Sequence, residues 1–143
     1  MTNTRVLLCV DPADDGYPYA LRALTRFASP GDEVHVLHVA QPEIEWVSDS
    51  RGRAALDSGP LARSLEQAMR ERGHEDARVT VTREPRRHVG DAIVEHAKEV
   101  DADVVVVATH GRSGFSRLVL GSVAERVVRA AHCDVYVARV PRT

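Results

Sequence analysis

Short apolar runs alternate along the chain with segments in which apolar residues recur every three or four positions. Continuous apolar runs of this length are typical of strands that are buried on both faces of a parallel sheet. Such runs occupy residues 6–10, 34–39, 104–107 and 135–140, and a weakly alternating segment at 77–82 adds a strand expected at an edge. The run at 104–107 consists of four valines and predicts a central strand.

Between the strands, the spacing of apolar residues predicts amphipathic helices. They are expected over residues 20–28, from Pro60 to about residue 72, over 89–100 and over 122–131. Strands and helices therefore alternate in the order βαβαβαβαβ, which predicts an α/β fold with a parallel sheet and helices on both faces. A chain of 143 residues fits one such domain, and we expect residues 1–143 to form it.

A long segment between the second strand and the second helix, residues 40–59, shows no clear periodicity. Structureless loops of this length are uncommon in compact domains and are often functional. The segment holds the only tryptophan, Trp46, next to apolar neighbours. It is interpreted first as a hydrophobic latch that holds the loop down, with a lid over a ligand or a partner surface as the alternative.

Composition and charge narrow the function classes. A net charge of −2 gives no broad electrostatic footprint for nucleic acid or for an anionic membrane. The local basic cluster of Arg83, Arg86, Arg87 and His88 is interpreted as a solvated turn rather than a phosphate contact. No apolar stretch is long enough to span a membrane, and the first residues do not resemble a signal peptide, so we expect a cytoplasmic protein.

The candidate chemistry follows the strands, because ligands of open parallel sheets bind beyond the carboxyl ends of the strands. These places hold Asp11, residues 39–41 and the glycine-containing segment from Ala108 onward. Gly121 and Ser122 open the last helix, whose first amides can bind a phosphate. The alternative is structural, because Ser122 and Glu125 also fit a capping box, in which the serine only caps the helix.

The spacing of the glycines resembles that of the universal stress proteins that bind ATP. Their pattern is Gly, two residues, Gly, nine residues, Gly, and then Ser or Thr. Gly111 and Gly121-Ser122 match its last three elements, whereas Ala108 stands at the first glycine. The valine-rich strand before this segment, the Gly-Ser-Val-Ala-Glu-Arg-Val helix start and the Asp11 that ends the first strand are also similar to the family, so the resemblance covers essentially the whole chain.

The resemblance implies a five-stranded parallel sheet in the order 3-2-1-4-5 and a site for ATP, or for AMP or ADP, with Mg²⁺ as a possible companion. Asp11 would contact the ribose or adenine side, and Val39 would flank the base. The nucleotide-binding residues that it implies are Asp11, Val39, Ala108, Gly111, Arg112, Gly121, Ser122 and Val123. It also implies a homodimer formed through the last strand, Asp134 to Val140, and a stress-response protein that signals by occupancy or by assembly.

The alanine at position 108 leaves two outcomes open for phosphate binding. If the backbone there needs a positive φ or touches the phosphate, a methyl group weakens binding; if the residue is an ordinary strand end, alanine is harmless. Two further functions also stay open: a slow ATPase that uses Asp11 or His110, and a dimeric scaffold that binds no nucleotide. His110 is interpreted mainly as a turn residue.

Several other sites are excluded by pattern. The chain has neither the P-loop sequence nor the dinucleotide fingerprint Gly-x-Gly-x-x-Gly. A phospho-receiver domain would need an aspartate after the third strand and a lysine after the fifth, where this chain has Thr82 with Arg83 and Arg139 with Val140. The histidines show no metal-ligand spacing, and the two cysteines suggest no disulfide framework.

Overall fold

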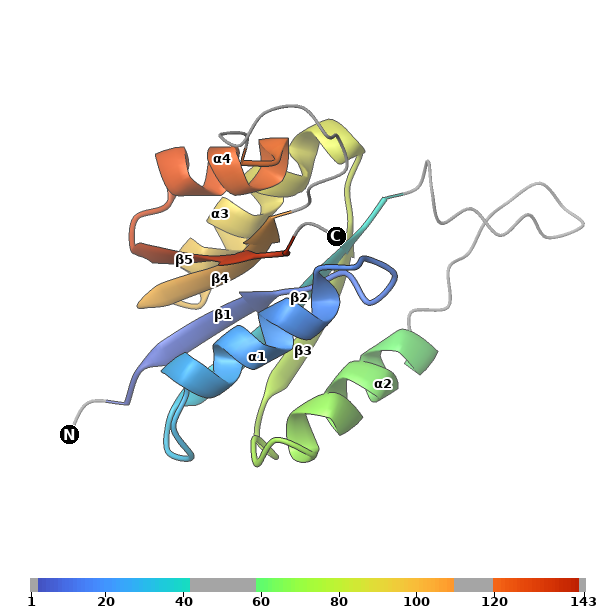
Figure 1. Ribbon diagram of the computed structural model, residues 1–143, viewed down its shortest axis with the longest axis vertical. Helices are drawn as coiled ribbons and strands as arrows, with labels where there is room; N and C mark the ends of the chain where they lie inside the picture. Colours follow the sequence, from blue (N-terminus) through green and yellow to red (C-terminus); the bar gives the residue numbers. More distant parts are fainter. Residues whose placement is uncertain (1–2, 42–58, 110–119, 142–143) are drawn as a thin grey trace, which may run out of the picture.

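A computed structural model describes residues 3–41, 59–109 and 120–141 and shows strands and helices in the predicted alternation (Figure 1). The elements are β1 (Arg5–Cys9), α1 (Tyr17–Phe27), β2 (Glu33–Ala40), α2 (Gly59–Arg70), β3 (Arg78–Arg83), a short 3₁₀ helix η1 (Arg86–His88), α3 (Val89–Glu99), β4 (Val104–Thr109), α4 (Ser122–Ala130) and β5 (Asp134–Arg139). Trp46 and the predicted latch or lid around it lie outside the described residues. No helix of the described segments is long and apolar enough to cross a membrane.

The five strands form one parallel sheet in the order β3-β2-β1-β4-β5, which confirms the predicted topology. β1 is central because it pairs with β2 on one side and with β4 on the other, with Leu8 opposite Val36 and Val106. The segment predicted as an edge strand is β3, which stands at one edge, and β5 stands at the other.

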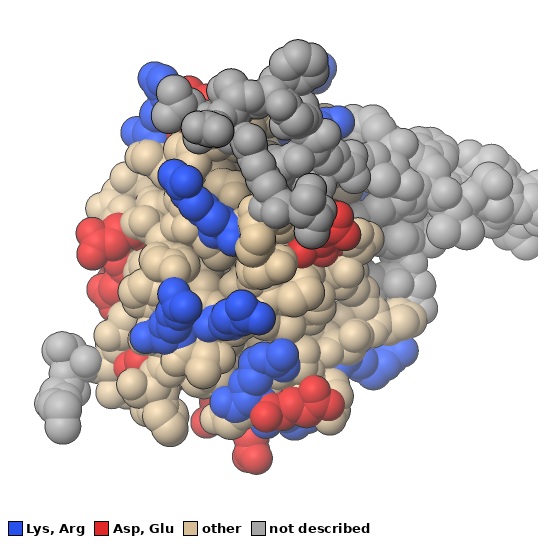
Figure 2. Space-filling view, in the orientation of Figure 1, with Lys and Arg blue, Asp and Glu red and all other residues tan. Residues whose placement is uncertain are grey.

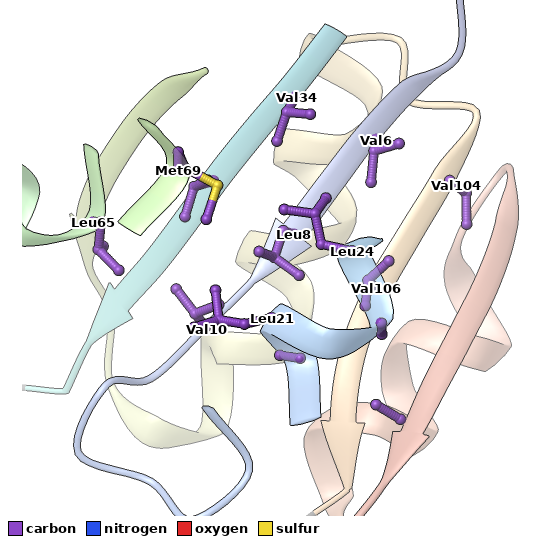
Figure 3. Close-up of a cluster of buried hydrophobic side chains, with 14 residues drawn as sticks. Val6, Leu8, Val10, Leu21, Leu24, Val34, Leu65, Met69, Val104 and Val106 are labelled. Carbon is purple, nitrogen blue, oxygen red and sulfur yellow. The ribbon is translucent and has the colours of Figure 1, made fainter. Parts of the chain in front are cut away.

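Helices α1 and α2 cover one face of the sheet (Figure 3). The side chains of Leu21 and Leu24 from α1, and of Leu65 and Met69 from α2, pack on alternate residues of the strands. Alternate strand residues point to the same face, so Val6, Leu8 and Val10 all belong to this cluster. Leu8, Leu24 and Met69 have no exposed surface, and this burial is the main source of stability on this face.

Helices α3 and α4 cover the opposite face and complete three layers. Here the intervening strand residues point inward, among them Leu7, Leu37 and Val105, and they meet Ile93 and Val127 of the helices. Because both faces are buried, the strands are continuous apolar runs, as the sequence pattern requires.

Two histidines interrupt the apolar run of β2, and both are buried. His35 is 6% exposed and lies 2.7 Å from a carboxylate oxygen of Glu33, while His38 is 2% exposed. His38 Nδ1 donates to the carbonyl of Val10 at 2.8 Å, and the amide of Val10 donates to Leu37 O at 3.0 Å. Both polar groups of the Val10 backbone are thereby tied to β2, just before the chain leaves the sheet at Asp11.

At the carboxyl end of β4, Ala108 packs against the start of α1. A Cβ atom added to Gly16 would lie 2.9 Å from Ala108 Cβ and 3.0 Å from Asp14 Oδ1, which is closer than side-chain atoms normally approach. The methyl group of Ala108 therefore takes the space that the missing side chain of Gly16 leaves. This contact sets how near the first turn of α1 comes to the sheet.

We expect Gly16→Ala to lower the free energy of unfolding by about 1–3 kcal/mol, the usual cost of overpacking. The Ala108→Gly background should recover much of that loss, because it removes the opposing methyl group. Urea denaturation of the two single variants and the double variant measures the coupling. Gly31→Ala is the matched control, since the nearest atom to its added Cβ is 3.9 Å away. If the losses of unfolding free energy of the two single variants simply added in the double variant, the contact between Gly16 and Ala108 would be contradicted.

Candidate functional site

A cleft opens at the carboxyl edge of the sheet, beyond the end of β1. β1 has β2 on one side and β4 on the other, and the connections from these strands cross opposite faces of the sheet. This is the topological switch point at which parallel sheets bind ligands. The cleft is lined by Cys9, Val10, Asp11, Asp14, Gly16, Tyr17, Ala20, Leu37, Val39, Gln41, Val89, Ile93, Val107, Ala108 and Val123.

Asp11 lies at this edge as predicted, in a turn that is held by its own polar groups. Asp11 Oδ1 accepts from the amide of Ala13 at 3.0 Å, and Asp11 O accepts from the amide of Asp14 at 3.0 Å. Asp14 Oδ1 then accepts from the amide of Gly16 at 2.6 Å. The turn places the carboxylate of Asp11 beside the cleft, where its second oxygen, Oδ2, can accept from a ligand hydroxyl or amine.

Val39 forms part of an apolar wall of the cleft. It is 7% exposed and lines the cleft together with Val89, Ile93 and Val107. These side chains come from the ends of β2 and β4 and from the first turns of α3. A flat apolar ring system can pack on such a wall, whereas charged ligand groups must lie elsewhere in the cleft.

The amino end of α4 faces the same cleft through Val123. Here the structure corrects the capping-box alternative. The N-cap residue is Gly121, with φ −53° and ψ 156°, and no side chain of the described residues caps the helix. Ser122 is the first helical residue and is exposed, while Glu125 pairs with Arg129 at 3.0 Å instead of reaching back. Within the described part of the chain, no side chain takes up the first amides of α4, which are the donors that a ligand phosphate would use.

Ala108 is an ordinary strand residue. It pairs with Ala138 of β5, and within the described residues only Asp101 among the non-glycine residues has a positive φ. The backbone at position 108 thus needs no glycine for its conformation. Gly111, Arg112 and His110 lie outside the described residues, so their expected roles remain predictions.

Burial keeps two titratable groups of the described cleft residues protonated. Burial raises the pKa of the Cys9 thiol far above its ordinary value, so the thiol stays protonated and unreactive at neutral pH. Burial also raises the pKa of the Tyr17 phenol, more than the opposing charge of Arg72 lowers it. The described residues contain no group of three or more His, Cys, Asp or Glu that could hold a metal ion.

The basic cluster predicted as a solvated turn lies at this edge of the sheet, before α3. Arg86, Arg87 and His88 form η1 and are exposed, and Arg87 Nε donates to His88 Nε2 at 2.8 Å. None of the three lines the cleft in the described part of the chain. These features fit the solvated turn.

Sequence reasoning did not single out several cleft residues, chiefly Asp14, Tyr17 and Val89. Gln41 belongs to residues 39–41, which are expected at the site because they follow the second strand. The resemblance to the family, however, assigns a role only to Val39. Tyr17 and Val89 carry no local signal, because each enters the cleft only through the way its helix packs on the sheet.

Comparison with known proteins agrees with this architecture. The family described as the universal stress protein family matches residues 2–139. A universal stress protein of Thermus aquaticus is 30% identical over 138 residues, which cover 94% of this chain and 97% of that protein. One of Methanocaldococcus jannaschii is 50% identical over 50 residues, but the match covers only 35% of this chain and 29% of the relative. The chain thus matches less than a third of that relative's length.

Solved structures share the fold. A universal stress protein in complex with cAMP superposes with a TM-score of 0.67 at 23% identity and covers 99% of this chain and all of the other. The universal stress protein of Archaeoglobus fulgidus in complex with dAMP superposes with a TM-score of 0.55 at 23% identity, covering 95% and 97% of the two chains. On the match over residues 2–139, the chain belongs to the universal stress protein family.

Proposed function

We propose that this protein binds an adenine nucleotide, ATP, in the cleft beyond β1 and acts as a binding module for it. The observation that carries the proposal is the helix start at Gly121, which no side chain of the described residues caps and which adjoins a cleft with an apolar wall. An uncapped amino end attracts phosphate, and an apolar wall accepts a base. The complexes of related folds with cAMP and dAMP support the same ligand class.

In the proposed complex, the base packs on Val39 and the ribose lies near Asp11. The phosphates meet the amides of Ser122 and Val123 at the start of α4, and Gly111 and Arg112 are expected to add further donors. Because β1 and β4 are parallel neighbours in the sheet, Asp11 and Ala108 lie at the same edge of the sheet. One extended nucleotide can therefore reach from Val39 to α4.

Magnesium would arrive with the phosphates in this proposal. The described residues offer no carboxylate cluster that would hold the ion by itself. Mg²⁺ in nucleotide sites commonly keeps several waters and takes phosphate oxygens as ligands. The residues present fit an ion carried by the nucleotide, with Asp11 and Asp14 as the carboxylates that line the described part of the cleft.

Gly121→Asp tests the phosphate end of the site. Aspartate is a good N-cap, so the nucleotide-free protein should stay as stable as the parent or gain a few tenths of a kcal/mol. Its charge would oppose the phosphates, and we expect the Kd for Mg-ATP to rise about tenfold or more. Isothermal titration calorimetry measures the affinity, and thermal unfolding without nucleotide measures the stability.

Gly121→Asn is the matched control, because asparagine has the same shape and caps a helix equally well without the charge. Its loss of affinity should be clearly smaller than that of the aspartate variant. Equal affinities of the two variants would contradict phosphate binding at α4. A parent protein that ignores millimolar Mg-ATP would leave the alternative of a nucleotide-free dimeric scaffold.

We further propose that the protein dimerises through the β5 edge and signals nucleotide occupancy through this assembly. β5 is an edge strand, and the two exposed large apolar side chains of the described residues, Phe27 and Val128, flank it. Phe27 packs against Tyr136 of β5 with ring centroids 4.5 Å apart and the rings tilted by 57°. Arg126 of α4 pairs with Asp91 of α3, so Val128 lies on the side of α4 that faces away from α3.

The charge of the face beside this edge favours a dimer contact along β5 rather than one through α1. A shallow hollow there is lined by Arg22, Arg26 and Arg139 together with Tyr19 and Tyr136, and Figure 2 shows basic side chains gathered on this side of the molecule. Like charges disfavour stacking of two α1 faces, whereas two β5 edges can pair across a two-fold axis.

We expect Val128→Glu to shift the protein from dimer to monomer, because two copies of the charge would meet near the two-fold axis. Light scattering after size-exclusion chromatography at micromolar concentration measures the mass. Glu95→Ala is a control for surface substitution on the neighbouring helix α3, where the side chain is exposed. A parent protein that is monomeric under these conditions would contradict the dimer.

The proposed place of action is the cytoplasm. Both cysteines, Cys9 and Cys133, are free, and burial raises the pKa of each thiol. Unpaired thiols suit a reducing compartment, in which disulfides are rare.

A further inference from the structure

Gln41 is the polar side chain that follows β2 directly, and it lines the cleft. Strand residues alternate between faces, so Gln41 continues the side of the sheet on which Leu37 and Val39 lie. The carbonyl of the preceding residue, Ala40, accepts from the amide of Glu84 at 3.0 Å. This bond extends the pairing with β3 past the end of β2 and fixes the backbone from which the Gln41 side chain projects.

The side-chain oxygen of Gln41 lacks a partner. Gln41 Oε1 is buried and accepts no hydrogen bond within the part of the chain that the structure describes. A buried acceptor without a donor costs free energy that a suitably placed donor would restore. Since the side chain borders the cleft, a donor on a bound ligand can meet this need.

Thr82 provides an internal comparison. Its Oγ1 is likewise buried without a partner among the described residues, and in the sheet Thr82 is paired with Val39. Paired residues of neighbouring strands point to the same face, so both oxygens lie near the same end of the same face. Thr82 does not line the cleft, however, and only Gln41 is placed to contact a ligand there.

We propose that Gln41 recognises the 6-amino group of the adenine base and is a specificity-determining residue of this site, an inference that rests on the proposed function. The wall residue Val39 lies two positions earlier on the same strand face, where the proposed complex places the base. A glutamine amide pairs with adenine through two hydrogen bonds, one from the amino group to Oε1 and one from Nε2 to the neighbouring ring nitrogen. A purine without the amino group leaves Oε1 unpaired.

The test compares Mg-ATP with the Mg²⁺ complex of purine riboside triphosphate, which lacks only the 6-amino group. Isothermal titration calorimetry gives the Kd of each ligand for the parent chain, Gln41→Leu and Thr82→Val, and circular dichroism checks their folding. We expect the parent to bind ATP about tenfold more tightly than the analogue, which corresponds to one well-placed hydrogen bond. Gln41→Leu should bind both ligands alike, whereas Thr82→Val should keep the parent's preference.

Three results would overturn the inference and leave ATP binding intact: a parent that binds both ligands equally, a Gln41→Leu variant that keeps the preference, or a Thr82→Val variant that alone loses it. A parent that binds neither ligand at millimolar concentration would instead refute the proposed function and this inference together. If Gln41→Leu fails to fold, Gln41→Met, which keeps the unbranched shape without the amide, replaces it with the same expected result.

Discussion

The burial of β1 on both faces is the constraint on which the rest of the structure depends. Leu7 and Leu8 point to opposite faces, and neither side chain has any exposed surface. A strand that is apolar on both faces must be covered by helices on both faces, and each crossover must return the chain to a parallel neighbour. The connections therefore leave the centre of the sheet in opposite directions, and the space between them at the end of β1 is the cleft.

Small residues decide how closely the helices approach this centre. Gly16 lets the first turn of α1 meet Ala108, and Gly90 plays a similar part between α3 and α4. A Cβ atom at Gly90 would lie 2.8 Å from Cβ and Cγ of Arg126. Next to this contact, Arg126 Nε pairs with Asp91 at 2.6 Å. The close approach holds the first turn of α4 beside α3, so that Val123 reaches the cleft together with Val89.

The site divides its tasks between backbone and side chains. In the proposed complex, the phosphates meet helix amides that no described side chain caps, and such donors respond to the charge of the ligand but not to the identity of its base. At the other end, Val39 offers apolar surface, and Gln41 supplies the polar side chain with an unmet acceptor. In the proposed complex, this division would let a cleft with few charged side chains among the described residues hold a highly charged ligand.

The sequence by itself determined the order of the elements, the parallel sheet and the edge of the sheet at which Asp11, Val39 and Ala108 meet. These features follow from local patterns, because valine-rich runs favour buried strands, the apolar spacing between them favours helices, and parallel strands all end at the same edge of the sheet. The sequence did not decide between a capped and an uncapped α4, because Ser122 and Glu125 satisfy the capping pattern while the helix begins one residue after Gly121. The tertiary structure also decided that alanine fits at position 108, that β2 buries two histidines, and that Gln41 faces the cleft without a partner. Each of these depends on contacts between elements far apart in the chain, and no local pattern encodes such contacts.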